Sequence, residues 1–157
     1  MRNARMVVSI IVIGVLTALT ATISSVAQSS TPSIVGTWET TVAPAGGTPS
    51  TPFQSMLTFF ADGNVVEVNA GNPAVTAPGR GVWTGSGNAY LMTFNLFSFD
   101  EKGKNTGKIK SYLSISMDGP NRFTCTFTAD AIDLTGKVTK KVASGTCEST
   151  RLEIGQP

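Results

Sequence analysis

The sequence predicts an all-β protein, an eight-stranded antiparallel up-and-down β-barrel. Three observations lead to this prediction. From Ser33 onward nearly every segment alternates apolar and polar residues, which is the pattern of a strand with one buried face. Turn segments rich in Gly, Asn and Asp separate these runs at short intervals. Successive hairpins in an even number favour closure into a barrel, which removes exposed strand edges.

Each predicted strand is bounded by turn residues. The strands are expected at residues 35–42, 53–60, 65–68, 81–84, 89–99, 108–117, 122–133 and 138–154. Asp62-Gly63 is a strong hairpin signal, because glycine adopts the positive φ that such a turn requires. Thr135-Gly136 is expected to form a two-residue turn between the last two strands. The stretch Gly85-Ser86-Gly87-Asn88 is interpreted as a turn, since a strand and no helix follows it.

The first 27 residues have the layout of a secretory signal peptide. Arg2 and Arg5 give a basic start, a charge-free apolar stretch follows, and Ser25-Val26-Ala27 places small residues at a cleavage site. An uncleaved membrane anchor is the alternative, because residues 6–27 are long enough to span a bilayer. We expect a signal peptide at residues 1–27, a linker at 28–33 and one barrel domain at 34–154. The mature protein is then exported, periplasmic or secreted, and has no membrane segment.

Composition argues against several functional classes. Loss of Arg2 and Arg5 leaves ten basic and ten acidic residues, and a neutral protein has no general attraction for nucleic acid. The lysines of segment 102–110 are interpreted as a solvated loop rather than an anion site. The sequence contains no histidine, hence no imidazole base and no His-based metal site. We expect no cofactor, no metal and no catalytic residues; the oligomeric state stays open.

The two cysteines, Cys125 and Cys147, predict a structural disulfide between the last two strands. With a two-residue turn at Thr135-Gly136, these cysteines lie one residue out of register. A β-bulge adds one residue to a strand, and Ala143-Ser144-Gly145 is the expected place for it. With that bulge the cysteines face each other within bridging distance.

An apolar lumen is predicted from the phase of each strand. If Trp38 points inward, alternation gives the other inward positions as Gly36, Thr40, Val42, Phe53, Leu57, Phe59, Val66, Val68, Met92, Phe94, Leu96, Leu113, Ile115, Met117, Phe123 and Phe127. The candidates for ligand contact are Phe59, Met92, Phe94, Leu113 and Phe127. A barrel of this size is either filled by its side chains or holds one small ligand. The sequence leaves both alternatives open.

The acidic residues of the strands are expected to face solvent. Glu39, Glu67, Asp130 and Glu148 mostly have the opposite phase to the apolar set. A buried pair of carboxyl groups would be able to perform acid–base chemistry. The opposite phase argues against that use.

Gly36 and Trp38 form a Gly-x-Trp triplet at the start of the first strand, and Arg151 lies in the last one. Together with the β-meander, these residues resemble the lipocalin-like (calycin) superfamily. The Phe59 to Gly63 segment and the run from Gly81 resemble small exported bacterial domains of that kind. The resemblance implies that Trp38 caps the closed end of the barrel beneath Arg151. An arginine stacked on an indole gains cation–π energy and excludes water from the barrel floor.

The leading functional hypothesis is an exported, non-enzymatic barrel that binds a small apolar ligand. A small-barrel cyclase or isomerase is the first alternative, because moulding a reactive substrate requires few polar groups. Tyr90, Tyr112 or Glu39 beside an open cavity would favour it. A secreted structural or interaction domain is the second, and an exposed aromatic patch would favour that.

Overall fold

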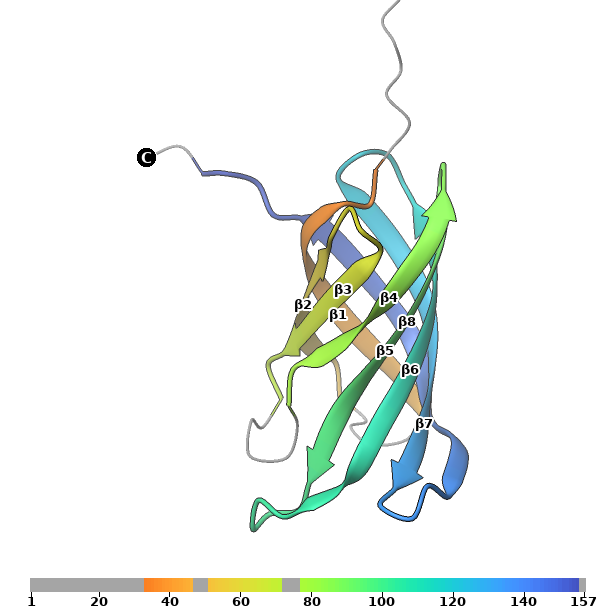
Figure 1. The fold of residues 1–157 in the computed structure, drawn as a ribbon. Coiled ribbons are helices and arrows are strands. Elements are labelled where there is room, and N and C mark those ends of the chain that lie inside the picture. The colour runs from red at the N-terminus through yellow and green to blue at the C-terminus, as the bar shows by residue number, and fades with distance from the viewer. Residues whose placement is uncertain (1–32, 47–50, 72–76, 156–157) are drawn as a thin grey trace, which may run out of the picture.

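The computed structural model describes residues 33–46, 51–71 and 77–155. They form a closed antiparallel barrel in which each strand pairs with its sequence neighbours and β8 pairs with β1 (Figure 1). The predicted eight-stranded up-and-down barrel is therefore confirmed. The strands are β1 (Gly36–Gly46), β2 (Phe53–Phe59), β3 (Asn64–Asn69), β4 (Gly79–Ser86), β5 (Ala89–Phe99), β6 (Asn105–Met117), β7 (Arg122–Asp133) and β8 (Val138–Arg151).

The predicted signal peptide lies outside the described residues, as does the linker except for Ser33. Across residues 33–46, 51–71 and 77–155, no helix has the length and apolar character needed to cross a bilayer.

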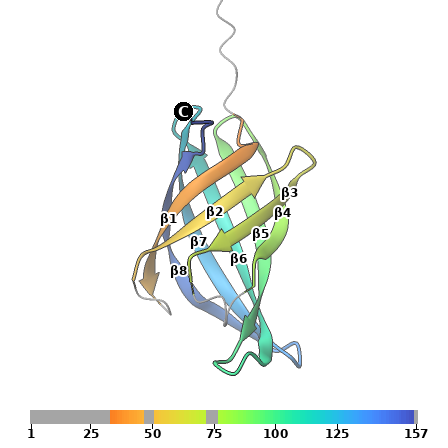
Figure 2. The same ribbon diagram turned by 90° about the vertical axis from the view of Figure 1, so that its left-hand side faces the viewer.

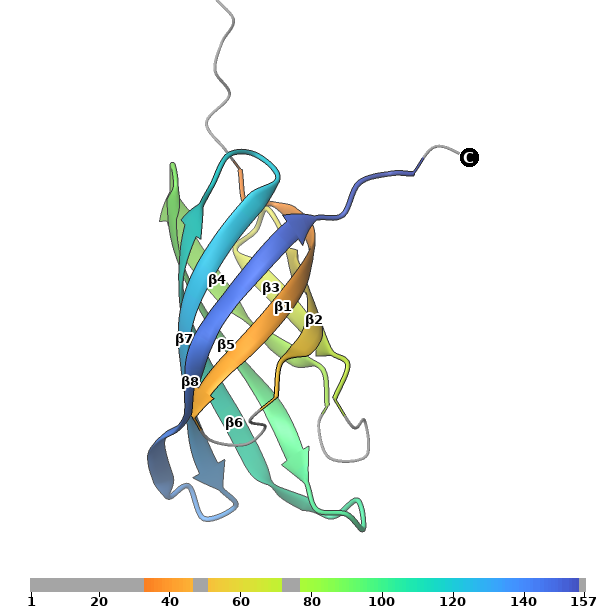
Figure 3. The ribbon, with the colours of Figure 1, turned by 180° about the vertical axis from the view of Figure 1, so that it is seen from behind.

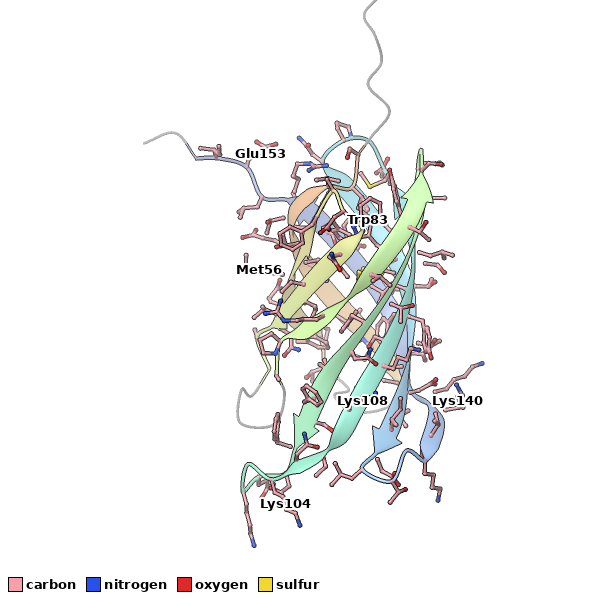
Figure 4. The ribbon with its side chains drawn as sticks, viewed as in Figure 1. Met56, Trp83, Lys104, Lys108, Lys140 and Glu153 are labelled. Atoms are coloured by element: carbon pink, nitrogen blue, oxygen red, sulfur yellow. A yellow bond between two sulfur atoms is a disulfide. The ribbon has the colours of Figure 1, made fainter. Side chains whose placement is uncertain are left out.

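The two ends of the barrel differ. We call one end the floor: the β2–β3, β4–β5 and β6–β7 hairpins turn there, and residues 33 and 155 lie at that side (Figures 1 and 2). The opposite end, where β1, β3, β5 and β7 finish, is called the distal end. Lys104 extends away from the barrel at the distal end (Figure 4). At the floor the amide of Leu152 donates to the carbonyl of Thr37 at 2.8 Å, so the two ends of the barrel chain meet where β8 lies beside β1 (Figure 3).

The first strand extends further than expected. Pairing of β1 with β2 ends at Val42 opposite Phe53, whereas pairing with β8 continues through Pro44 opposite Gly145. Proline lacks the N–H that a central strand donates, and it is tolerated where only one side of the strand is paired. The strand therefore continues to Gly46, beyond its predicted end at Val42, into a Pro/Gly-rich segment.

The β2–β3 hairpin has a three-residue loop. The amide of Phe60 donates to the carbonyl of Asn64 at 2.9 Å, and Gly63, at φ 87°, follows Ala61 and Asp62. This loop length places Phe59 opposite Val65. Directly opposed residues of an antiparallel pair share a face, so Val65 points inward with Phe59.

The phase predicted for β3 is therefore wrong. Val65 and Glu67 are buried in the barrel, with 1% and 4% of their surfaces exposed, while Val68 is 48% exposed. Val66 shares the outward phase of Val68. A two-residue turn would have placed Val66 opposite Phe59, and a shift of one residue turns every side chain to the other face. The expectation that Glu67 faces solvent is wrong for the same reason.

The β7–β8 hairpin also has a three-residue loop, and its bulge lies elsewhere than predicted. The amide of Asp133 donates to the carbonyl of Lys137 at 3.1 Å, so the two-residue turn at Thr135-Gly136 is wrong. The register shifts between Ala131 opposite Thr139 and Ala129 opposite Ala143. The bulge therefore includes Lys141, at φ 52°, and not Ala143-Ser144-Gly145.

The predicted disulfide is confirmed. Cys125 lies directly opposite Cys147, with a Cα–Cα distance of 4.9 Å. Both cysteines point into the barrel and are buried.

Aromatic side chains fill the floor half of the barrel. The rings of Trp38 and Phe123 have centroids 4.8 Å apart, and Phe59 meets Phe123 edge-on at 6.2 Å. Trp83 contacts Phe59 at 6.1 Å and Tyr90 at 5.7 Å. Offset and edge-to-face arrangements of this kind stabilise aromatic clusters beyond their burial alone. This half of the interior is the hydrophobic core.

Arg151 closes the floor. Its guanidinium carbon lies 4.2 Å from the centre of the Trp38 ring, and it donates to the carbonyls of Val35 at 2.7 Å, Pro120 at 2.9 Å and Ser33. Gly36 has φ 135°, and a Cβ there would lie 2.5 Å from Arg151 Nη1. The glycine of the Gly-x-Trp triplet is therefore required by the arginine that covers the tryptophan.

Candidate functional site

The distal half of the barrel contains a cavity of about 540 Å³. This volume is within the range of small-ligand sites in proteins. Side chains from β1, β2, β3, β5, β6, β7 and β8 reach its wall. The lining residues are Thr40, Val42, Pro44, Thr51, Phe53, Ser55, Leu57, Glu67, Asn69, Gly71, Phe94, Leu96, Ile109, Ser111, Leu113, Cys125, Phe127, Ala129, Ala143 and Cys147.

The five residues predicted for ligand contact fall into two groups. Phe94, Leu113 and Phe127 line the cavity. Phe59 and Met92 also point inward and are buried, with 1% and 2% exposed, but they pack on the floor side of the cavity wall. The sequence left open whether the lumen is filled by side chains or hollow. In the structure the floor half is filled and the distal half is hollow.

One acidic side chain faces this largely apolar cavity. Glu67 is buried on β3, and Ser55 Oγ on β2 donates to its Oε1 at 2.8 Å. Among the described residues, the other carboxylate oxygen, Oε2, accepts no hydrogen bond. A buried acceptor without a partner costs about 1–3 kcal/mol, and more when it is charged. Such a group is uncommon in a folded protein unless it has another use.

Burial raises the pKa of Glu67, because the low-polarity surroundings disfavour the carboxylate. The hydroxyl of Ser55, the side chain of Asn69 and the backbone amide of Gly79 act in the opposite direction without cancelling the effect of burial. The protonated form of Glu67 is therefore favoured over a wider pH range than in an exposed glutamate.

Gly79 packs closely against the unpartnered oxygen. It is the residue of β4 that pairs with Glu67. A Cβ at Gly79 would lie 3.1 Å from Glu67 Oε2 and 2.6 Å from Cδ2 of Phe94. Both atoms are too near to admit a side chain at position 79, so the glycine lets β4 lie close against the Glu67 carboxyl group and the Phe94 ring.

A second polar contact inside the barrel joins two hydroxyl groups that bind each other. Thr40 Oγ1 and Ser149 Oγ lie 2.8 Å apart and form a hydrogen bond between β1 and β8. Both residues are buried. Thr40 lines the cavity, but its hydroxyl already has a partner, in contrast to Glu67 Oε2.

The other strand carboxylates lie outside the lumen. Glu39 and Glu148 are exposed, as predicted. Asp130 points outward but is only 4% exposed, because the β8 bulge covers it. Lys140 Nζ donates to Asp130 Oδ2 at 2.8 Å, and the Lys141 amide donates to Oδ1 at 2.9 Å. These hydrogen bonds lower the pKa of Asp130, so this carboxylate holds the bulge in place.

Neither tyrosine lines the cavity. Tyr90 is buried against Trp83 on the floor side. Tyr112 has the outward phase of β6, and Lys110 Nζ lies 5.3 Å from its ring centroid. Within the part of the chain that the structure describes, no group of three or more Cys, Asp or Glu residues is arranged to hold a metal ion.

A smaller outer groove of about 220 Å³ crosses β1, β2, β7 and β8. Its lining is mostly polar and includes Glu39, Gln54, Arg122 and Glu148. The charges in this groove are of both signs, so it presents no uniform field to a ligand.

Sequence reasoning missed Glu67, Ser55 and Asn69 as residues of the lumen. The alternation in β3 fits two phases, since valines stand at positions 65, 66 and 68. The loop sequence fits both phases as well, because Gly63 can take the positive φ as the second residue of a two-residue turn or as the third residue of a three-residue loop. The three-residue loop of the structure places Val65, Glu67 and Asn69 inward.

No family model matches the chain, and no curated protein matches it. Among solved structures, the chain is similar to EF1p2_mFAP2b, whose structure contains bound DFHBI. The sequences are 15% identical, with a TM-score of 0.47, and the match covers 76% of this chain and 93% of that chain. A likeness of this size carries no conclusion about function.

Proposed function

We propose that this protein is a non-enzymatic binding protein that holds a small, largely apolar molecule in the distal half of its barrel. The observation that supports the proposal is the cavity of about 540 Å³ inside a closed barrel. Apolar side chains of β5, β6 and β7, including Phe94, Leu113 and Phe127, form much of its wall. Water in such a cavity gains few hydrogen bonds, so an apolar ligand replaces it favourably.

We further propose that the protein acts outside the cytoplasm, after cleavage behind Ala27. The disulfide between Cys125 and Cys147 is consistent with this location, because disulfides persist in oxidising compartments. The pattern of residues 1–27 is the other support.

A cyclase or isomerase is the second candidate, and Glu67 is the observation that favours it. A buried carboxyl group with a raised pKa is suited to accept and return a proton. The residues first considered for this role, Tyr90, Tyr112 and Glu39, do not line the cavity. Turnover of a bound compound that Glu67→Gln abolishes, with binding retained, would favour the enzyme.

The binding proposal is tested with Nile red, a neutral apolar dye whose fluorescence increases in an apolar site. We expect saturable binding of one dye per chain to the wild type. Ala129 lines the cavity and is 4% exposed. Ala129→Phe places a ring in the cavity and is expected to weaken binding by about tenfold or more, the equivalent of roughly 1.4 kcal/mol.

Ala43→Phe provides the matched control. Ala43 is exposed at the same end of the barrel and points outward from β1. This variant is expected to bind the dye as the wild type does. If Ala129→Phe binds Nile red as tightly as the wild type does, the dye lies outside the cavity. If the wild type does not bind Nile red, the proposal is contradicted.

A further inference from the structure

Glu67 is the one ionisable group among the described residues that line the cavity. The other side chains of the lining are apolar, hydroxyl or amide groups or the disulfide. The nearest basic residue along β4, Arg80, is exposed and its side chain points outward. Its neighbour Gly79 is the residue that lies against Glu67. The described residues thus supply no positive charge inside the barrel to pair with this carboxyl group.

The free oxygen belongs to a side chain that lines the cavity. Oε1 is engaged by Ser55, while Oε2 has no hydrogen-bond partner among the described residues. Oε2 and the aromatic ring of Phe94 both pack against Gly79, and Glu67 and Phe94 both line the cavity. A buried, unpartnered acceptor beside an aromatic ring suits a group that donates hydrogen bonds and carries positive charge.

We propose that the ligand is an apolar molecule with a protonated amine, whose N–H group donates to the carboxylate of Glu67 while the apolar body fills the cavity. This inference rests on the proposed binding function and specifies its ligand class. An ammonium group both donates hydrogen bonds to the carboxylate and neutralises its charge, as buried charges require. An alcohol donates one hydrogen bond but leaves the charge unpaired. A carboxylic acid brings a second negative charge next to Glu67 and is disfavoured.

The proposal also predicts how binding depends on pH. Without ligand, burial favours the protonated form of Glu67, and an ammonium group binds to the carboxylate. Amine affinity therefore increases as the pH rises through the raised pKa of Glu67. The alkylammonium itself stays charged, since its pKa is near that of lysine, about 10.4.

Among the described residues, no other titratable side chain faces Glu67 from the strands around it. Ser55 and Leu57 of β2, Gly79 of β4 and Phe94 of β5 face Glu67, and none of these residues has an ionisable side chain. Val65 and Asn69, the inward residues of β3 itself, are also uncharged. Arg80 carries a charge but points away from the lumen.

The experiment compares n-octylamine, octan-1-ol and octanoic acid as competitors of Nile red at neutral pH. These probes have the same chain length and differ in the head group. We expect the amine to displace the dye at concentrations about tenfold to a hundredfold lower than the acid, with the alcohol between them, as a charge-assisted hydrogen bond predicts. In Glu67→Gln the amine is expected to lose this advantage. Glu39→Gln removes an exposed outer carboxyl group and should leave the order unchanged.

The outcomes separate this inference from the binding function. If wild type and Glu67→Gln both bind Nile red but the alcohol or the acid competes as well as the amine, the ligand class is wrong and the binding function stands. An amine preference that survives in Glu67→Gln contradicts the role of Glu67. If the wild type binds no Nile red and none of the three compounds, both proposals fail.

The pH profile of the wild type tests the same inference without a variant. Between about pH 4 and pH 8, amine affinity should rise while octanol affinity does not. If the two affinities change in parallel, Glu67 is not the partner of the amine. This measurement remains decisive if Glu67→Gln fails to fold.

Discussion

The side chains of Ser55 and Glu67 meet across β2 and β3, where a hydroxyl group donates to one of the two carboxylate oxygens at 2.8 Å. A fully apolar residue at position 67 would enlarge the hydrophobic core without any cost of burying a charge. The glutamate instead leaves Oε2 without a partner among the described residues. At the scale of the residue, stability is reduced at the place where the ligand is proposed to bind.

This cost predicts a pH-dependent difference in stability between the wild type and Glu67→Gln without ligand. Because burial raises the pKa of Glu67 above its ordinary value of 4.5, the folded state binds the proton more tightly than the unfolded state. The contribution of Glu67 to stability is therefore complete below that value and is lost as the pH rises through the folded pKa. Glu67→Gln should melt a few degrees higher than the wild type at neutral pH, and this advantage should disappear in acid.

Thermal unfolding followed by circular dichroism at a series of pH values measures this difference. Glu39→Gln serves as the control, since Glu39 is exposed on the outside of β1. Its difference from the wild type should not change with pH in the same way. A Glu67→Gln curve that runs parallel to the wild type at every pH would show that Glu67 is not destabilised by burial.

At the scale of the element, strand positions were predictable from the alternation, and loop length was not. Two-residue and three-residue hairpin loops both place a glycine at a position with positive φ, so Asp62-Gly63 and Thr135-Gly136 fit either. The choice is decided by contacts distant in sequence. In β3 the three-residue loop buries Val65 beside Phe59. In β8 the bulge at Lys141 depends on Asp130, a residue of the opposite strand.

The cysteine pair was predictable despite the wrong bulge position. Two cysteines on adjacent strands need a register within one or two residues of the correct one, and the actual bulge supplies the shift at Lys141 rather than at Ala143-Ser144-Gly145. What the sequence could not indicate is that both sulfur atoms line the cavity. That placement follows from the phase shared by Cys125, Phe123 and Phe127.

Removal of the disulfide tests its structural role. The bridge closes a loop with a sequence separation of 22 residues, for which the loss of chain entropy predicts a stabilisation of about 3 kcal/mol. The double variant Cys125→Ala/Cys147→Ala should lose about this free energy of unfolding in urea titrations. The wild type treated with reductant should approach the same value. Unchanged stability in both cases would mean that the bridge constrains nothing in the unfolded chain.

At the scale of the molecule, the two halves of the barrel differ in packing: the floor half is filled and the distal half contains the cavity. In the floor half Phe123 contacts both Trp38 and Phe59, whereas small side chains such as Ala129 and Ala143 line the distal wall. Phenylalanines occur in both halves, so their number did not reveal which half is hollow. The distribution of small inward residues determines this, and it becomes visible only when the register of all strands is known.

This division predicts that a change in the floor reduces stability but not binding. Trp38→Phe keeps an aromatic ring but loses the 2.8 Å hydrogen bond from Nε1 to the carbonyl of Ile34 and weakens the contact with Arg151. We expect a loss of about 2 kcal/mol in unfolding free energy. Nile red affinity should stay at the wild-type value, since Trp38 does not line the cavity. Weaker dye binding by a folded Trp38→Phe protein would contradict the separation of the two halves.

The contact of Arg151 with the first strand at the floor affects the order in which the chain becomes structured during its synthesis. Arg151 binds the carbonyl of Val35, which lies 116 residues earlier, and β1 has β8 as one of its two neighbours. A chain that emerges N-terminus first therefore presents β1 long before its last partner exists. Until then one edge of β1 stays unpaired and Trp38 lacks its cover, and such edges are prone to pair with other chains. Ring closure must wait for the final strand, so this protein completes its fold only after its C-terminal residues have been made.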